Sequence, residues 1–227
     1  MSRTVRWGGL HNARDLGGLP VRGGGSTRVG RIYRSGRLDG LDAGGWQQLV
    51  ADGVTSLVDL RNGSEVREVP LRPTALTVSV RPIEDEHDAE FMAEWRGRLG
   101  NPGYYPVAVA RWPELFRAAF QAVADAPDGG VLIHCSAGRD RTGLVTSLLL
   151  EAAGVERKAI LDDYEWSVRA TNDWLAANPV SHETAVDAST LATRIADARA
   201  ALTAFLDDVD RQPFAAPLAA AAARLTH

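Results

Sequence analysis

The sequence predicts a single-domain α/β fold with a mostly parallel central sheet flanked by helices. Short β-favouring apolar runs over 55–60, 76–80 and 131–133 alternate with helical patterns along the chain, and strands separated by helices usually pair in parallel. A chain of 227 residues, 45% of them hydrophobic, can bury one sizeable core. Because no linker divides it, we expect one domain over 1–227.

The N-terminal region predicts a short hairpin. Gly17-Gly18 and Gly23-Gly24-Gly25 flank it, because glycine supplies the backbone conformations that tight turns need. We expect an ion pair between Arg14 and Asp15 to tie this hairpin to the rest of the fold.

The helices are predicted from apolar positions spaced three and four residues apart. Glycine and proline mark where several of them stop, among them Pro70. The predicted helices cover 41–50, 64–69, 113–124, 144–151, 156–174, 191–209 and 214–225. The last two make 189–227 a helical tail, to which we assign no motif.

The stretch 81–112 is the least regular part of the sequence. It holds the acidic cluster 84–90 and several aromatic residues, and prolines interrupt it. We predict a mobile cover over the edge of the sheet. Its aromatic side chains either contact substrate or pack in the core, and packing is the interpretation that we favour.

One segment, Val131–Gly143, carries the chemistry. Apolar residues bring Cys135, the only cysteine, to the end of a buried strand, and a glycine-containing loop leads on into a helix. Gly138 lets the loop fold tightly enough to aim several N–H groups at one point, and the helix that starts near Arg141 adds the positive end of its dipole. This pattern predicts a phosphate site.

The residue types in this loop predict a nucleophile inside an oxyanion cradle. A helix N-terminus and neighbouring cations favour the thiolate form of Cys135 at neutral pH, and the planar guanidinium of Arg141 can hold two phosphate oxygens. A buried cysteine is more often a small hydrophobe, but several independent positions agree here. We expect substrate to bind Ser136, Ala137, Gly138, Arg139, Asp140 and Arg141.

The run His134-Cys135-Ser136-Ala137-Gly138-Arg139-Asp140-Arg141-Thr142-Gly143 resembles the signature loop of the cysteine-dependent protein tyrosine phosphatase superfamily. The resemblance covers roughly residues 10–170 and points to a bacterial branch that removes phosphate from tyrosine and, in several members, from serine, threonine or phosphoinositides. The segments 12–18, 32–36, 58–61 and 163–164 also match this branch. The resemblance implies that Thr142 stabilises the thiolate as it leaves the phosphocysteine. We interpret His134 as structural, holding the loop and tuning the thiol.

The general acid has more than one candidate. Asp59 and Cys135 both end predicted strands, and the ends of parallel strands meet at one edge of a sheet. We therefore favour Asp59, which is also the candidate that the resemblance implies; alternatively, it caps the turn at 62–63. Asp140 is the second contender, although the neighbouring Arg141 should hold it ionised, and it could instead orient that arginine. The cluster 84–90 is a distant third.

Two arginine features bear on the substrate. The first 37 residues hold eight arginines against one acid, which form either a solvated face or a surface that draws in a phosphorylated substrate. Arg139 stands where the branch carries lysine, and an added cation at the rim should favour multiply phosphorylated substrates. The alternative is a solvated side chain or a salt bridge to a nearby acid.

Composition excludes several classes of protein. A net charge of −4 gives no bulk attraction to nucleic acid, and no stretch approaches the roughly 18–20 apolar residues of a membrane span. One cysteine excludes an internal disulfide and a multi-cysteine zinc site, and the expected chemistry needs no metal and no cofactor. Without an apolar N-terminal leader, we expect a soluble, cytoplasmic protein of undetermined oligomeric state.

Three functions compete. The leading one is hydrolysis of a phosphorylated protein or phosphoinositide through a phosphocysteine intermediate. The second is a phosphate-binding module without turnover, which usually requires loss of Cys135 or Arg141, and both are present. The third is a rhodanese-like sulfur transferase, against which Thr142-Gly143 and the arginine six positions after the cysteine argue.

Overall fold

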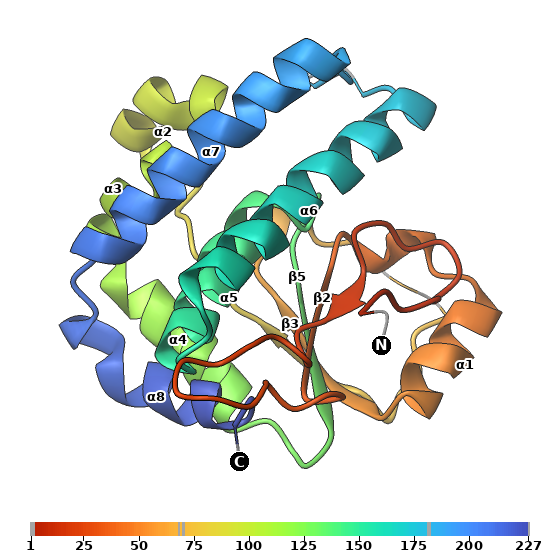
Figure 1. Cartoon of the computed structure of the whole chain (residues 1–227). Coiled ribbons are helices and arrows are strands. Elements are labelled where there is room, and N and C mark those ends of the chain that lie inside the picture. The colour runs from red at the N-terminus through yellow and green to blue at the C-terminus, as the bar shows by residue number, and fades with distance from the viewer. Residues whose placement is uncertain (1–2, 68, 70, 181–182, 227) are drawn as a thin grey trace.

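The computed structural model describes residues 3–67, 69, 71–180 and 183–226. It confirms the predicted α/β fold: a five-stranded sheet has the order β1-β2-β5-β3-β4 and is flanked by helices (Figure 1). Strand β1 pairs antiparallel with β2, and the other pairs are parallel. The strands are β1 (Arg14–Asp15), β2 (Ile32–Ser35), β3 (Val54–Asp59), β4 (Thr77–Val80) and β5 (Gly130–His134).

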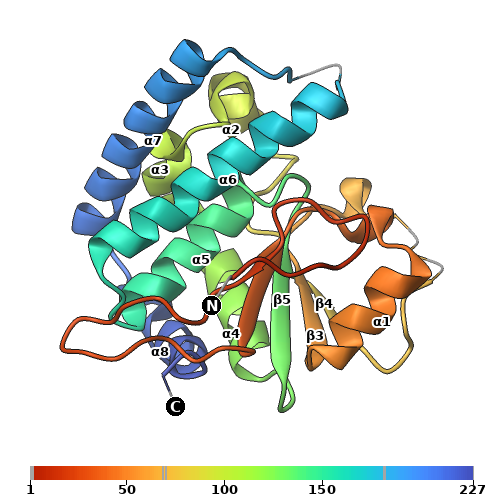
Figure 2. The same ribbon diagram turned by 45° about the vertical axis from the view of Figure 1, so that its right-hand side comes forward.

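Helices cover both faces of the sheet (Figure 2). Helix α1 (Ala43–Ala51) packs with Trp7 and Leu57 in a smaller apolar cluster on one face. Val58, the next residue of β3, belongs to the larger cluster on the other face, because successive side chains of a strand point to opposite sides.

The larger cluster is built on the remaining helices. Helix α5 (Asp140–Ala152) runs directly from the loop after β5 and is buried along most of its length. No helix among the described residues combines the length and the apolar character that a membrane crossing requires. The helices are α2 (Ala89–Trp95), α3 (Tyr105–Arg111), α4 (Pro113–Ala124), α5 (Asp140–Ala152), α6 (Arg157–Ala177), α7 (Ala188–Asp208) and α8 (Ala215–Ala223).

The predicted helix over 64–69 is wrong in extent. The chain makes only one 3-10 turn, Gly63–Glu65, and Val66 is already extended with φ −74° and ψ 128°. The carboxylate of Glu65 folds back to accept the Asn62 N–H at 3.2 Å, which caps the start of this turn. Two residues of the predicted helix region, Glu68 and Pro70, lie outside the described residues.

The stretch 81–112 is more regular than its prolines indicated. It contains α2, α3 and the 3-10 turns Arg96–Arg98 and Pro102–Tyr104. Pro106 lies in the first turn of α3, where a missing N–H costs no helical hydrogen bond. Its buried aromatic residues confirm the packing interpretation: Phe91, Tyr104 and Tyr105 belong to the core. Its mobility as a cover stays a prediction.

The N-terminal hairpin is present as a single antiparallel bridge between Pro20 and Ser26. The predicted ion pair between Arg14 and Asp15 is wrong, because adjacent residues of a strand point to opposite faces. Asp15 instead accepts the N–H groups of Gly17 and Gly30, each at 2.7 Å. Arg14 instead donates to the carboxylate of Asp163 on α6, at 2.8 Å.

Candidate active site

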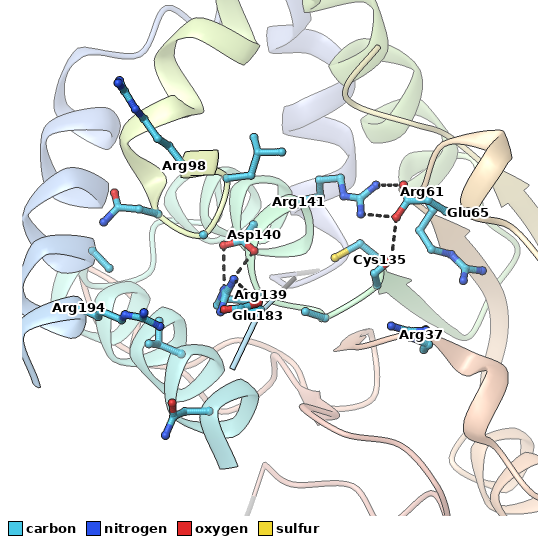
Figure 3. Close-up of a pocket in the computed structure, with 18 of the residues that line it drawn as sticks. Arg37, Arg61, Glu65, Arg98, Cys135, Arg139, Asp140, Arg141, Glu183 and Arg194 are labelled. Atoms are coloured by element: carbon cyan, nitrogen blue, oxygen red, sulfur yellow. Dashed lines mark hydrogen bonds and ion pairs between the residues drawn. The ribbon is translucent and has the colours of Figure 1, made fainter. Parts of the chain in front are cut away.

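Cys135 directly follows β5, the strand at the centre of the sheet. Its side chain is buried at the wall of a cavity of about 1160 Å³ (Figure 3). The loop passes so close to β2 that a Cβ on Gly138 would lie 2.4 Å from the Ser35 carbonyl oxygen, and φ at this glycine is +69°. Only glycine can follow this path. Helix α5 then begins at Asp140, so the positive end of its dipole lies at the cavity.

The guanidinium of Arg141 lies at the same cavity and binds the carboxylate of Glu65 through both terminal nitrogens (Figure 3). Glu65 also accepts the Ser136 hydroxyl at 2.8 Å. Since Glu65 takes one N–H from each terminal nitrogen, the side edge of the guanidinium, Nε with Nη2, keeps N–H donors for an anion. On that edge, the Nε of Arg141 lies 3.8 Å from Oε2 of Glu84.

The ion pair between Glu65 and Arg141 should make the stability of the fold depend on pH. Burial opposes ionisation of this carboxyl, but the bonds from Arg141 and Ser136 outweigh it and lower its pKa from 4.5 to about 2. Because the pKa is lower in the folded state, the pair stabilises the fold above pH 4.5, and this contribution is lost as pH falls from 4.5 towards 2. We expect Glu65→Gln to unfold about 2–4 °C below wild type at pH 6, the shift that about 1 kcal/mol produces in a chain of this size.

Thermal unfolding of both proteins between pH 6 and pH 2 checks this prediction. The two midpoints should converge as the pH falls through that window. Glu114→Gln is a matched control, because Glu114 forms an exposed pair with Arg117 at 2.8 Å. A gap between wild type and Glu65→Gln that stays constant down to pH 2 would refute the prediction.

Asp59 lies beside the loop in register, as its strand position predicts, because Asp59 of β3 pairs with His134 of β5. Its carboxylate, however, accepts bonds from three donors of Arg61: the backbone N–H (3.0 Å), Nε (2.9 and 3.2 Å) and Nη2 (2.8 Å). It is buried and is not among the residues that line the cavity. Asp59 therefore braces Arg61, while the turn at 62–63 is capped by Asn62 and Glu65.

His134 is buried beneath the loop. Its Nε2 is 3.8 Å from Asp59, and its Nδ1 is 3.5 Å from the Cys135 carbonyl oxygen. Burial lowers the pKa of His134 below its usual value, so the imidazole is neutral at pH 7. It is not a lining residue of the cavity.

Asp140 does line the cavity, and its partner is Arg139 rather than Arg141. Arg139 donates to both oxygens of Asp140, at 3.0 and 3.1 Å, and to both oxygens of Glu183, at 2.7 and 3.3 Å. Tyr164 donates a further bond to Asp140 at 3.3 Å. Arg139 is therefore a buried, paired cation, which corresponds to the salt-bridge alternative for its role.

Thr142 lies in the first turn of α5 and is completely buried. Its hydroxyl makes no hydrogen bond to any described protein group, the thiol of Cys135 included. Such a group normally finds a partner, because leaving it unpaired costs about 1–3 kcal/mol.

Glu65 was not among the site residues predicted from the sequence, and Glu84 was predicted only as a member of the cluster 84–90. The signal that could have found both is the rule already applied to Asp59: the loop after β3 carries Glu65, the one after β4 carries Glu84, and parallel strands deliver these loops to one edge. No comparable signal exists for Glu183, which reaches the loop from the connection between α6 and α7. Among the described residues, no cluster of His, Cys, Asp or Glu is arranged to hold a metal ion.

A thiol at the end of the central parallel strand, a glycine-bent loop at a helix N-terminus and an arginine at the same cavity define an anion site of the cysteine-dependent phosphatase class. Residues 5–214 match the tyrosine phosphatase family, and the chain belongs to this family.

Three curated relatives are similar to this chain. A Cupriavidus necator protein named as a tyrosine-protein phosphatase is 33% identical over 162 residues, 68% of this chain and 59% of the relative. The triple specificity protein phosphatase PtpB of Mycobacterium tuberculosis is 31% identical over 189 residues, 69% and 66% of the two chains. A tyrosine-protein phosphatase of Nostoc commune is 33% identical over 135 residues, 57% and 44%. Each match spans less than two thirds of the relative's length.

Proposed function

We propose that this protein is a protein tyrosine phosphatase that hydrolyses phosphomonoesters through a phosphocysteine on Cys135. The observation that carries the proposal is the placement of Cys135 and Arg141 at one cavity, at the N-terminus of α5. The helix dipole and the guanidinium both favour negative charge there, which a bound phosphoryl group carries. Family membership supports the same activity.

The reaction has two steps. The Cys135 thiolate attacks phosphorus, an S–P bond forms, and the P–O bond to the leaving group breaks as an acid protonates the leaving oxygen. Water then attacks phosphorus, gives a proton to the same side chain, and the S–P bond breaks to release inorganic phosphate and the thiolate. The unpaired hydroxyl of Thr142 supports a role in which it donates to this departing sulfur.

We assign the acid to Asp140. A general acid must come within hydrogen-bond reach of the leaving oxygen, so position is decided before acidity. Asp140 lines the cavity, whereas Asp59 is held by Arg61 away from it and Glu84 is bonded to Tyr104 at 2.8 Å. This assignment reverses the earlier preference for Asp59 over Asp140, which rested on the position of Asp59 at a strand end.

Leaving-group dependence tests this assignment. We expect Asp140→Asn to lower kcat/KM for an alkyl phosphate by roughly 10²–10⁴, and to change it little for an activated aryl phosphate whose leaving group needs no proton. Asp59→Asn should slow both substrates by a similar factor, because it only loosens the turn at Arg61. A selective loss in Asp59→Asn, with equal losses in Asp140→Asn, would return the role to Asp59.

For the substrate we propose phosphotyrosine together with phosphoserine and phosphothreonine in proteins. A cavity of about 1160 Å³ is wide for a single aromatic ring, and the name of the Mycobacterium tuberculosis relative indicates breadth. The cation that would have favoured multiply phosphorylated lipids, Arg139, is paired with Asp140 and Glu183.

Hydrolysis of p-nitrophenyl phosphate in the presence of a chelator, blocked by vanadate, is the direct test. Binding of phosphate without turnover would favour the binding-module alternative, and transfer of sulfur from thiosulfate to cyanide would favour the sulfur transferase. Comparing kcat/KM for phosphotyrosine, phosphoserine and phosphoinositide substrates then fixes the substrate class. A preference for phosphoinositides would contradict the substrate proposal.

A further inference from the structure

Three consecutive carbonyl groups of the loop after Cys135 are held by the N-terminal region. All three donors come from residues 12–37. The Ser136 oxygen accepts the Arg37 backbone N–H at 2.9 Å, the Ala137 oxygen accepts the Asn12 side-chain amide at 3.2 Å, and the Gly138 oxygen accepts the Arg34 guanidinium at 2.7 Å.

This arrangement decides where the amide groups of the loop point. In a trans peptide the C=O and the following N–H point in opposite directions, and no described peptide bond is cis. The N–H groups of Ala137, Gly138 and Arg139 therefore face away from the N-terminal donors. In the part of the chain that the structure describes, none of these three N–H groups donates to a protein group. Donors that lack an internal partner are available to an anion.

The two side-chain donors are themselves fixed. Asn12 has the left-handed φ of +58°, and its Oδ1 accepts the guanidinium of Arg14 at 2.6 Å. Arg34 is 1% exposed and bonds Asp163 of α6 at 2.7 Å. The Asp163 carboxylate also forms ion pairs with Arg14 at 2.8 Å and with Arg3 at 2.9 Å.

The charges beneath the loop do not balance. Burial opposes ionisation of Asp163, but the guanidinium groups of Arg14 and Arg34 hold the pKa of that carboxyl well below its usual range. Burial lowers the pKa of Arg14 only to about 10, so it is charged at pH 7. The carboxylate of Asp163 therefore faces three guanidinium groups, counting Arg3. Arg3 also interacts with Asp15, so three cations meet two carboxylates and a positive charge remains in excess under the anion site.

We propose that Asn12 and Arg34 are positioning residues, which fix the peptide planes of the loop so that its N–H groups face the thiolate of Cys135 and the phosphoryl group. This inference rests on the proposed role of Cys135 as the nucleophile. It also gives a structural role to the two N-terminal segments 12–18 and 32–36. These segments contribute neither the nucleophile nor the candidate acids.

Asn12→Asp tests the inference with a side chain of the same shape. It keeps an acceptor for Arg14 but replaces the donor to the Ala137 carbonyl with a second oxygen. Because it adds a negative charge that also disfavours a thiolate, the uncharged Asn12→Gly must show a shift in the same direction. Because Cys135 is the only cysteine, the rate of iodoacetamide alkylation reports its thiolate fraction without requiring turnover. We expect the pH midpoint of alkylation to rise by about one unit, and kcat/KM for p-nitrophenyl phosphate to fall by about 10²-fold.

Arg3→Gln is the matched control. It also removes a cation from Asp163, but Arg3 makes no hydrogen bond to the loop carbonyls among the described residues, and its side chain is 17% exposed. We expect a wild-type alkylation midpoint in this variant. Should Asn12→Asp fail to fold by circular dichroism, Asn12→Gly keeps the left-handed backbone and removes the same donor, so the same shift is expected from it.

The outcomes separate the two proposals. A wild-type midpoint near that of a free thiol, without turnover, would overturn the proposed function. A low midpoint and full activity in wild type, retained in a folded Asn12 variant, would overturn the positioning role alone. A shift of equal size in Arg3→Gln would also overturn it, because general loss of charge around Asp163 would then explain the effect.

Discussion

Replacing Cys135 with serine is expected to reduce kcat by on the order of 10⁴-fold or more, since the nucleophile is removed and an alcohol of far higher pKa takes its place. The loop amides and Arg141 remain, so calorimetry should still detect binding of inorganic phosphate. In wild type, rapid quenching during turnover should trap a phosphoenzyme that is absent from the variant.

Near-normal turnover by Cys135→Ser would contradict the phosphocysteine mechanism, and so would failure to trap any phosphoenzyme in wild type. Loss of phosphate binding together with loss of turnover would instead show that the sulfur shapes the cradle. Circular dichroism of the variant provides the folding control.

Arg141→Lys is expected to lower kcat/KM by about 10²–10³, the cost of losing a preorganised donor to the transition-state oxygens. The structure gives a specific reason. Arg141 binds Glu65 through both terminal nitrogens, and in the proposed mechanism its side edge holds the phosphoryl group. One ammonium cannot replace both bidentate contacts. Both kcat and KM for p-nitrophenyl phosphate should therefore change.

Arg98→Lys is the matched control for this substitution, because Arg98 lines the far end of the same cavity (Figure 3) and lies over the Trp95 ring, 5.8 Å from its centre. It should retain most of the wild-type kcat/KM. Equal losses in the two variants would show that the effect is not specific to the guanidinium of Arg141.

Most of the fold follows from local patterns. Strands β3, β4 and β5 and helices α4 and α6 are marked by apolar periodicity and by turn residues, and all lie where they were expected. Strand β2 was not predicted, because two of its four residues, Arg34 and Ser35, are polar. The buried Arg34 bonds to Asp163, Thr146 and the Gly138 carbonyl. These partners lie more than 100 positions further along the chain, so no local pattern indicates them.

The positions of the residues at the centre of the candidate site could be predicted from the sequence, and those at its rim could be predicted less well. Cys135 and Arg141 lie in one continuous segment, where spacing carries the geometry. The rule for strand ends correctly placed Asp59 next to β5, but that rule fixes a backbone position and not a side-chain direction. Arg61, two residues on, turns the carboxylate of Asp59 away, and this local competition could not be judged without coordinates.

The position of β5 between β2 and β3 has a consequence for folding kinetics. Ile32 pairs with Val131 and Leu57 with Leu132, so the central strand can pair only after two long loops of chain have closed, and such non-local pairings form slowly. The donors that orient the loop arrive on the same segments. Catalytic competence should therefore appear in the same cooperative step that closes the sheet, and a partly folded chain would carry the cysteine without the reactivity.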